Sequence, residues 1–223
     1  MKIQGEKTMW TLITKDLMVA RSSMLTYALM AAAMILFFSR MEMGSAFIAT
    51  WSIVLPYFFS GRICYQEEVE GGLGLLRSLP VSPGAIVASK FAGGLLLTIG
   101  GSLLVIAAGG LAHWLGWFAP QGGVSLIISL AFSLALVLVL EGLFFLVFFT
   151  WDYKRASNVM LLPLLGLLPL AFPSFFRPVI RWVVDRITVD SWYFLTGLLL
   201  ASLICYLAFG LLAAWVFSRR DVG

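Results

Sequence analysis

Long apolar runs separated by short polar segments dominate the chain. Six runs can be delimited, at residues 24–39, 45–62, 84–112, 124–150, 157–173 and 192–217. A helix needs about 20 consecutive apolar residues to cross a bilayer, whereas a membrane β-barrel would show alternation in segments of about 10 residues. The pattern predicts an all-α polytopic membrane protein in which residues 1–223 form a single transmembrane domain with six transmembrane helices.

The composition supports this class and changes how the net charge is interpreted. The chain is 61% hydrophobic and 12% charged, while a soluble domain has about a quarter of its residues charged. A water-soluble globule is therefore excluded. The net charge of +4 does not indicate nucleic acid, because the basic residues of a multi-pass protein gather in its cytoplasmic loops.

The distribution of Lys and Arg predicts the orientation. Eleven would lie on one side of the membrane: Lys2, Lys7, Lys15, Arg21, Arg62, Arg77, Lys90, Lys154, Arg155, Arg219 and Arg220. Four would lie on the other: Arg40, Arg177, Arg181 and Arg186. We therefore expect a cell-membrane protein with both termini in the cytoplasm. The pattern in residues 173–191 predicts an amphipathic helix or a re-entrant element on the outer surface. If the fifth and sixth runs instead formed a hairpin that does not cross the membrane, the topology would change.

Two other local patterns predict how helices are placed. Before the first run, Met9, Trp10, Ile13 and Leu17 recur at helical spacing, which predicts an amphipathic helix lying in the membrane interface. In the third run, small residues repeat every seven positions at Gly94, Gly101 and Ala108. Small residues on one face let another helix approach closely.

Residues 65–90 interrupt the apolar pattern with YQEEVEGGLGLLRSLPVSPGAIVASK. Glu67, Glu68 and Glu70 are expected to form an acidic turn, and a leucine cluster around Arg77 follows. Ser82 and Pro83 are a typical N-cap and first-turn pair, so a new helix should begin there. The segment thus predicts a short amphipathic cytoplasmic helix. A protein groove suits its leucines better than the anionic leaflet, which the glutamates would repel.

The candidate chemistry is sparse. There is no G-x-x-x-x-G-K-[ST] loop to cradle ATP phosphates, and a glutamate protease built on Glu67 and Glu68 would lack its nearby arginine. A single histidine and two distant cysteines predict no metal site and no disulfide. Glu141 lies inside the fourth run, where a charge marks a functional site by default. It could serve the substrate pathway or gating, or be a protonated or hydrogen-bonded glutamate at a helix contact.

The residues of the interrupting segment are similar to a motif of a known family. They are Glu67, Glu68, Gly71, Gly72, Leu75, Leu76, Ser78, Leu79, Pro80, Val81, Ser82 and Lys90. The pattern resembles the membrane subunits of ABC exporters of the type two family, especially the small stand-alone permeases of bacteria. The chain length, the six runs and the interfacial helix fit that architecture.

The resemblance implies a coupling helix that seats on a separate ABC ATPase subunit, with Glu67, Glu68, Leu76, Arg77 and Leu79 in the contact. It also implies that ATP and Mg are bound by that subunit and no cofactor by this chain. Six spans are half a transporter, so a second permease chain, identical or paralogous, should complete it. The interfacial helix, Lys15 included, would lie near the ATPase subunit. This chain would be no enzyme by itself.

Two other functions fit the same pattern from residues alone. A non-ABC membrane scaffold could bind a cytosolic partner through residues 65–82, and so could a secondary transporter. The latter should show internal repeats or broken polar helices, for which Pro163 and Pro169 are the only candidates. The substrate is left open. The aromatic residues at Phe144, Phe145, Phe148 and Phe149 suit an amphipathic substrate, but lipid contact is the simpler expectation for them.

Overall fold

The computed structural model describes residues 2–38, 44–69, 71, 81–116, 126–162 and 191–219, and all regular elements in these ranges are helices. They are α1 (Lys2–Phe38), α2 (Gly44–Val69), α4 (Pro83–Trp114), α5 (Leu126–Thr150), α6 (Tyr153–Val159) and α10 (Ser191–Arg219). The all-helical class predicted from the apolar runs is confirmed for this part of the chain.

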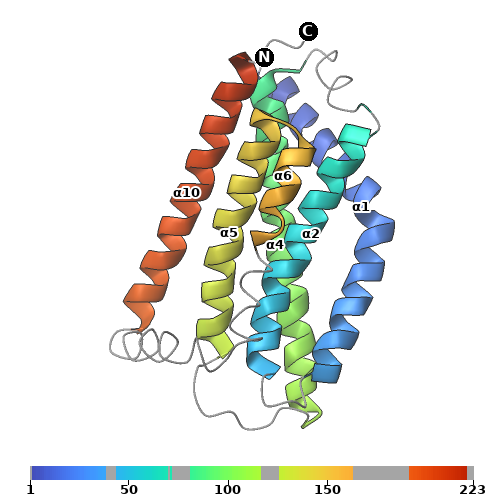
Figure 1. Cartoon of the computed structure of the whole chain (residues 1–223), viewed down its shortest axis with the longest axis vertical. Coiled ribbons are helices and arrows are strands. Elements are labelled where there is room, and N and C mark those ends of the chain that lie inside the picture. The colour runs from blue at the N-terminus through green and yellow to red at the C-terminus, as the bar shows by residue number, and fades with distance from the viewer. Residues whose placement is uncertain are drawn as a thin grey trace.

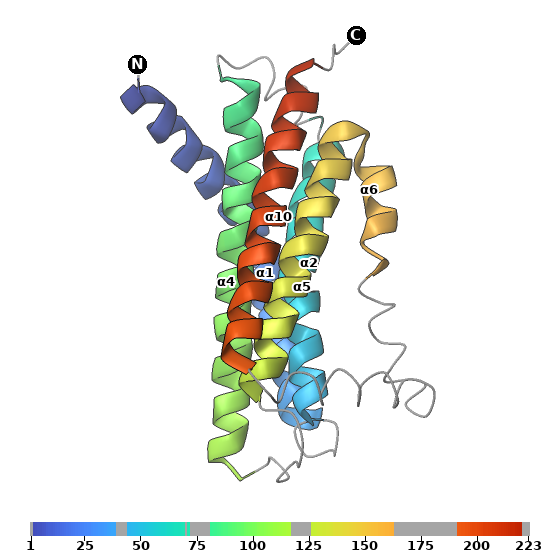
Figure 2. The ribbon, with the colours of Figure 1, turned by 90° about the vertical axis from the view of Figure 1, so that its left-hand side faces the viewer.

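The long helices form one bundle (Figures 1 and 2). α5 lies against both α2 and α10, while α4 lies against α1 and α2. The two chain termini lie at the same end of the bundle, together with the beginning of α4 and the short connection between α5 and α6 (Figure 2). This end is called the terminal end below.

Three of the described helices are long and apolar enough to cross a membrane: Pro83–Ala112, Leu130–Thr150 and Trp192–Arg219. The last carries exposed aromatic side chains near both of its ends, at Trp192 and Trp215. The Arg219 guanidinium lies 4.1 Å from the centre of the Trp215 ring. Aromatic residues at both ends are typical of the two membrane–water interfaces. The helix lengths and this pattern are those of a polytopic membrane protein.

The N-terminal segment differs from the expected arrangement. The predicted interfacial helix and the first run, 24–39, belong to the single helix α1. No glycine or proline occurs between Glu6 and Phe38, so nothing in the sequence ends the helix. Its N-terminal part leans away from the bundle (Figure 2). Trp10 is exposed as expected, but Ile13 is buried.

The ends of two other helices also differ from expectation. α2 continues through Glu67 and Glu68 to Val69, so these glutamates form its last turn and no separate acidic turn. The fifth run was predicted to begin at residue 157, but α6 already begins at Tyr153. An Asp152 side-chain oxygen accepts a hydrogen bond from the backbone N–H of Arg155 at 2.7 Å, which fixes that start. Residues 163–190, with most of the fifth run and the outer element, lie outside the described residues.

The core centres on α5, and here the expectation of lipid contact was wrong. Phe144, Phe145, Phe148 and Phe149 are all fully buried in the main core cluster. Their spacing places them on two adjacent rows of one helix face. That face packs against other helices, including Tyr57 of α2 and Phe91 of α4. Apolar periodicity could not distinguish lipid from protein contact, because both surroundings are apolar.

Candidate functional site

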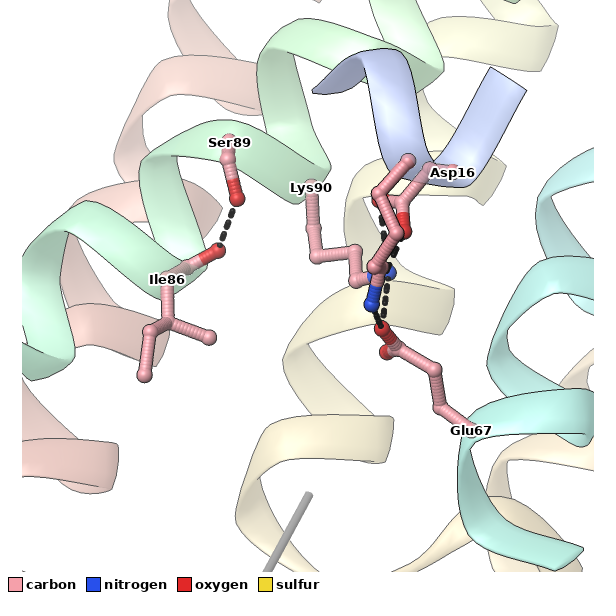
Figure 3. Close-up of polar contacts among 6 residues, drawn as sticks. Asp16, Glu67, Ile86, Ser89 and Lys90 are labelled. Carbon is pink, nitrogen blue, oxygen red and sulfur yellow. Dashed lines mark hydrogen bonds and ion pairs between the residues drawn. The ribbon is translucent and has the colours of Figure 1, made fainter. Parts of the chain in front are cut away.

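Three helices contribute to a buried group of charges (Figure 3). The group lies near the terminal end, where α4 begins (Figure 2). The Lys90 Nζ of α4 lies 2.7 Å from an Asp16 oxygen of α1 and 2.7 Å from a Glu67 oxygen of α2. The Lys90 side chain is only 4% exposed, and both carboxylates are nearly as buried. We call these residues, together with Lys15, the lysine–carboxylate cluster.

Lys15 completes the charge balance of the cluster from its outer side. Its Nζ lies 2.6 Å from Glu67 Oε1 and 3.4 Å from Asp16 Oδ1, while 41% of its side chain is exposed. Two lysines thus face two carboxylates, and the cluster is formally neutral. Buried charges are tolerated only when they are paired and hydrogen-bonded. The cluster therefore ties α1, α2 and α4 together around one ammonium group.

The cluster also joins the two ends of the interrupting segment, residues 65–90. Glu67 lies near the beginning of the segment, in the last turn of α2, and Lys90 is its last residue, about two turns into α4. α4 begins as predicted, because the Ser82 hydroxyl accepts a hydrogen bond from the backbone N–H of Ala85 at 3.3 Å. The two ends of the segment are therefore held together by a direct ion pair.

The predicted ATPase-contact residues have different surroundings. Glu67 points into the lysine–carboxylate cluster. Glu68 is exposed and its carboxylate accepts a hydrogen bond from the backbone N–H of Tyr153, which links α2 to the first turn of α6. Leu76, Arg77 and Leu79 lie outside the described residues.

Sequence reasoning missed the pairing of Asp16 with Lys90. The only signal for it was that each is a charged residue next to apolar neighbours, and such residues need partners when buried. The two are 74 positions apart, so no local spacing could have matched them.

Glu141 forms a second polar contact deeper in the bundle. Its side chain is fully buried on α5. The Ser60 hydroxyl of α2 donates to Glu141 Oε1, and the Thr98 hydroxyl of α4 donates to Oε2 at 2.8 Å. Both carboxylate oxygens thus have a partner, as a buried polar group requires. Of the alternatives that the sequence left open, the geometry shows the hydrogen-bonded helix contact.

A void lies between the two polar groups. Its volume is about 10 Å³, and Asp16 and Lys90 of the cluster line it together with Ser60, the donor to Glu141. This is at the lower limit of the space that can hold one water molecule. The lysine–carboxylate cluster and the Glu141 contact are therefore near neighbours along the bundle.

Close packing around Glu141 depends on a glycine. A Cβ atom on Gly94 would lie 2.6 Å from the ring of Phe145 and 2.9 Å from Glu141 Oε1. A Cβ on Gly101 would lie 3.3 Å from side-chain atoms of Leu55 and Pro56. The predicted close approach of helices at Gly94 and Gly101 is therefore confirmed.

Candidate metal ligands do not gather in the part of the chain that the structure describes. No group of three His, Cys, Asp or Glu residues there could hold a metal ion. Cys64 is buried and Cys205 is exposed, and both are free thiols. The polar chemistry of the described residues is thus that of ion pairs and hydrogen bonds between helices.

A comparison with known families gives this arrangement a context. The family model described as "ABC-2 family transporter protein" matches residues 11–217, which is most of the chain. No curated protein matches the sequence. The matched region includes the lysine–carboxylate cluster, the interrupting segment and Glu141. The resemblance drawn from the segment between Tyr65 and Lys90 is confirmed, and the chain belongs to the ABC-2 family of transporter proteins.

Proposed function

We propose that this chain is the membrane-spanning permease subunit of an ATP-driven ABC exporter. The family match carries the proposal, because an ABC-2 membrane protein implies a permease role and an ABC ATPase partner. The sequence contains no phosphate-binding loop of the G-x-x-x-x-G-K-[ST] type. ATP and Mg would therefore be bound by the separate subunit, and a second permease chain would complete the transporter.

The proposed topology has six spans with the terminal end in the cytoplasm. Lys15 and Lys90 meet at this end, and Figure 2 places both termini and the beginning of α6 there as well. A concentration of basic residues at one end supports a cytoplasmic location. In this topology α1 and α2 cross the membrane together with the three helices that qualify by length and composition.

We further propose that residues 70–82 are the coupling helix and its flanking turns. Leu76, Arg77 and Leu79 would contact the ATPase subunit, and the exposed Glu68 would lie at the edge of the contact. Glu67, already paired with Lys90, would fix the segment at its α2 end. A movement of the coupling helix would then act directly on the cluster that joins α1, α2 and α4.

Leu76→Asp should weaken binding of the ATPase subunit by about 30-fold or more. A charge placed at an apolar anchor of an interface costs on the order of 2 kcal/mol, and each 1.4 kcal/mol is a factor of ten. Leu76→Met conserves volume and polarity and should bind normally. The affinity of the reconstituted permease for its ATPase is the measurement. Equal affinity for both variants would show that residue 76 does not contribute to the interface.

Glu141 is proposed to act in gating, because it is a buried acidic group whose hydrogen bonds join three helices. Glu141→Gln keeps an amide oxygen and an N–H for the two hydroxyls, so the protein should insert and fold normally. Loss of the ionisable group should lower the transport rate at least about tenfold, which corresponds to about 1.4 kcal/mol. Transport at the wild-type rate would leave Glu141 with a packing role alone.

A further inference from the structure

An open apolar groove of about 960 Å³ lies between α1, α2 and α4. Leu17 and Leu25 of α1 form one wall, and Phe59 of α2 and Leu97 of α4 lie opposite. Ligand pockets in proteins range from about 300 to 1,000 Å³. The groove is thus large enough for a ligand and far larger than a packing defect.

The groove is about as long as one leaflet is deep. On α1 its lining runs from Leu17 to Ala28. At a rise of 1.5 Å per residue these eleven steps cover about 16 Å. Half of a hydrocarbon core of about 30 Å is about 15 Å. Leu17 directly follows Asp16, so the groove begins beside the lysine–carboxylate cluster and runs along α1 away from the terminal end. In the proposed topology, this direction leads toward the middle of the membrane.

The charge of the groove is concentrated in one side chain. Among the described residues that line it, Arg21 is the single charged one, and it lies in the half nearest the cluster. Arg21 forms no ion pair with any of the side chains that the structure describes, where every ion pair belongs to the cluster. The neighbouring cluster is neutral, so it does not offset the Arg21 charge. An exposed guanidinium above an apolar surface is complementary to an anionic head group with an apolar tail.

We propose that this groove binds an anionic phospholipid from the leaflet at the terminal end of the bundle. The phosphate would pair with Arg21, and an acyl chain would lie along Leu25, Leu97 and Leu104. The site goes beyond the transport function, because it needs neither the ATPase subunit nor a transported substrate. It makes the three helices that share the lysine–carboxylate cluster sensitive to the composition of the surrounding membrane.

A glycine in the groove provides a precise way to fill it. Gly100 lines the groove, and a Cβ atom added there would have no heavy atom within 4 Å. A larger side chain at this position starts from open space and is expected to fill part of the groove. Gly110 on the same helix is equally open but does not line the groove, so it supplies a matched control.

The test is photolabelling of the full chain in lipid nanodiscs. Phosphatidylglycerol and phosphatidylcholine with the same diazirine-bearing acyl chain would be compared, and labelled residues in 17–28 and 96–104 located by mass spectrometry. One basic residue is worth about 1 kcal/mol toward anionic lipid, so the wild type should favour phosphatidylglycerol about fivefold. Arg21→Gln should bring the ratio to about one. Gly100→Leu should reduce labelling by both lipids, whereas Gly110→Leu should leave it unchanged.

Equal labelling of the wild type by both lipids would overturn the proposal, as would a ratio that survives Arg21→Gln. Absence of both lipids from the groove, with cross-links between two copies of the chain, would instead identify the groove as an interface between permease chains. Arg21 is exposed, so its replacement is expected to leave the fold intact and to give a result even if the Gly100 variant fails to fold. None of these labelling results depends on binding of the ATPase subunit.

Discussion

Lys90→Met is expected to destabilise the protein by about 3–5 kcal/mol, the cost of removing one partner from a buried ion pair. The ammonium group of Lys90 contacts both Asp16 and Glu67 at 2.7 Å. Without it, two buried carboxylates share only Lys15, which is partly exposed to solvent. The free energy of unfolding in lipid bicelles, determined by steric trapping, measures this loss.

Lys15→Met is the matched control for that prediction. Lys15 contacts the same two carboxylates but has 41% of its side chain exposed. Solvent screening should therefore limit its contribution to about 1 kcal/mol or less. The double variant Asp16→Asn with Lys90→Met should recover part of the lost stability, because one uncompensated carboxylate is removed. Equal losses for Lys15→Met and Lys90→Met would contradict the asymmetry between the buried and the exposed lysine.

Gly94→Ala should destabilise the bundle by about 1–3 kcal/mol, the range for overpacking a tight core. The added methyl would lie 2.6 Å from Phe145 and 2.9 Å from a Glu141 oxygen. Either the ring and the carboxylate move or α4 and α5 separate. A separation would also disturb the hydrogen bond from Thr98 to Glu141. Thermal unfolding of the purified variant in detergent measures the effect.

Substitution of the adjacent residue, Gly93, separates the effect of packing from the effect of helix propensity. A Cβ atom on Gly93 would meet nothing within 4 Å. Gly93→Ala should therefore be neutral or stabilise the helix by up to about 1 kcal/mol. If both alanine variants unfolded at the wild-type temperature, the close approach of α4 and α5 at Gly94 would be refuted.

Features with a local cause could be predicted from the sequence. The apolar runs gave α4, α5 and α10 to within a few residues, and the start of α4 followed from Ser82 and Pro83. The start of α6 at Tyr153, set by the Asp152 N-cap, was equally local, yet the apolar run alone began four residues later. The continuous α1 could have been inferred from the absence of helix-breaking residues.

Features that depend on distant partners could not be predicted. Lys90 was counted as a loop cation and as part of the family motif, but it is the centre of a cluster spanning three helices. Glu67 was expected to face a partner subunit, while its carboxylate is turned toward Lys90 (Figure 3). Charge and hydropathy indicate that a buried charged residue needs a partner of opposite charge. Only the tertiary structure shows which residue is that partner.

The most direct test of the permease proposal is purification of this chain from its native membrane in a gentle detergent, with all co-purifying polypeptides quantified by mass spectrometry. The proposal predicts an ABC ATPase subunit in an amount equal to the permease, and its loss from the Leu76→Asp variant. Recovery of the chain without any ATPase, across several detergents and with an ATP analogue present, would contradict it and favour a secondary transporter or a membrane scaffold.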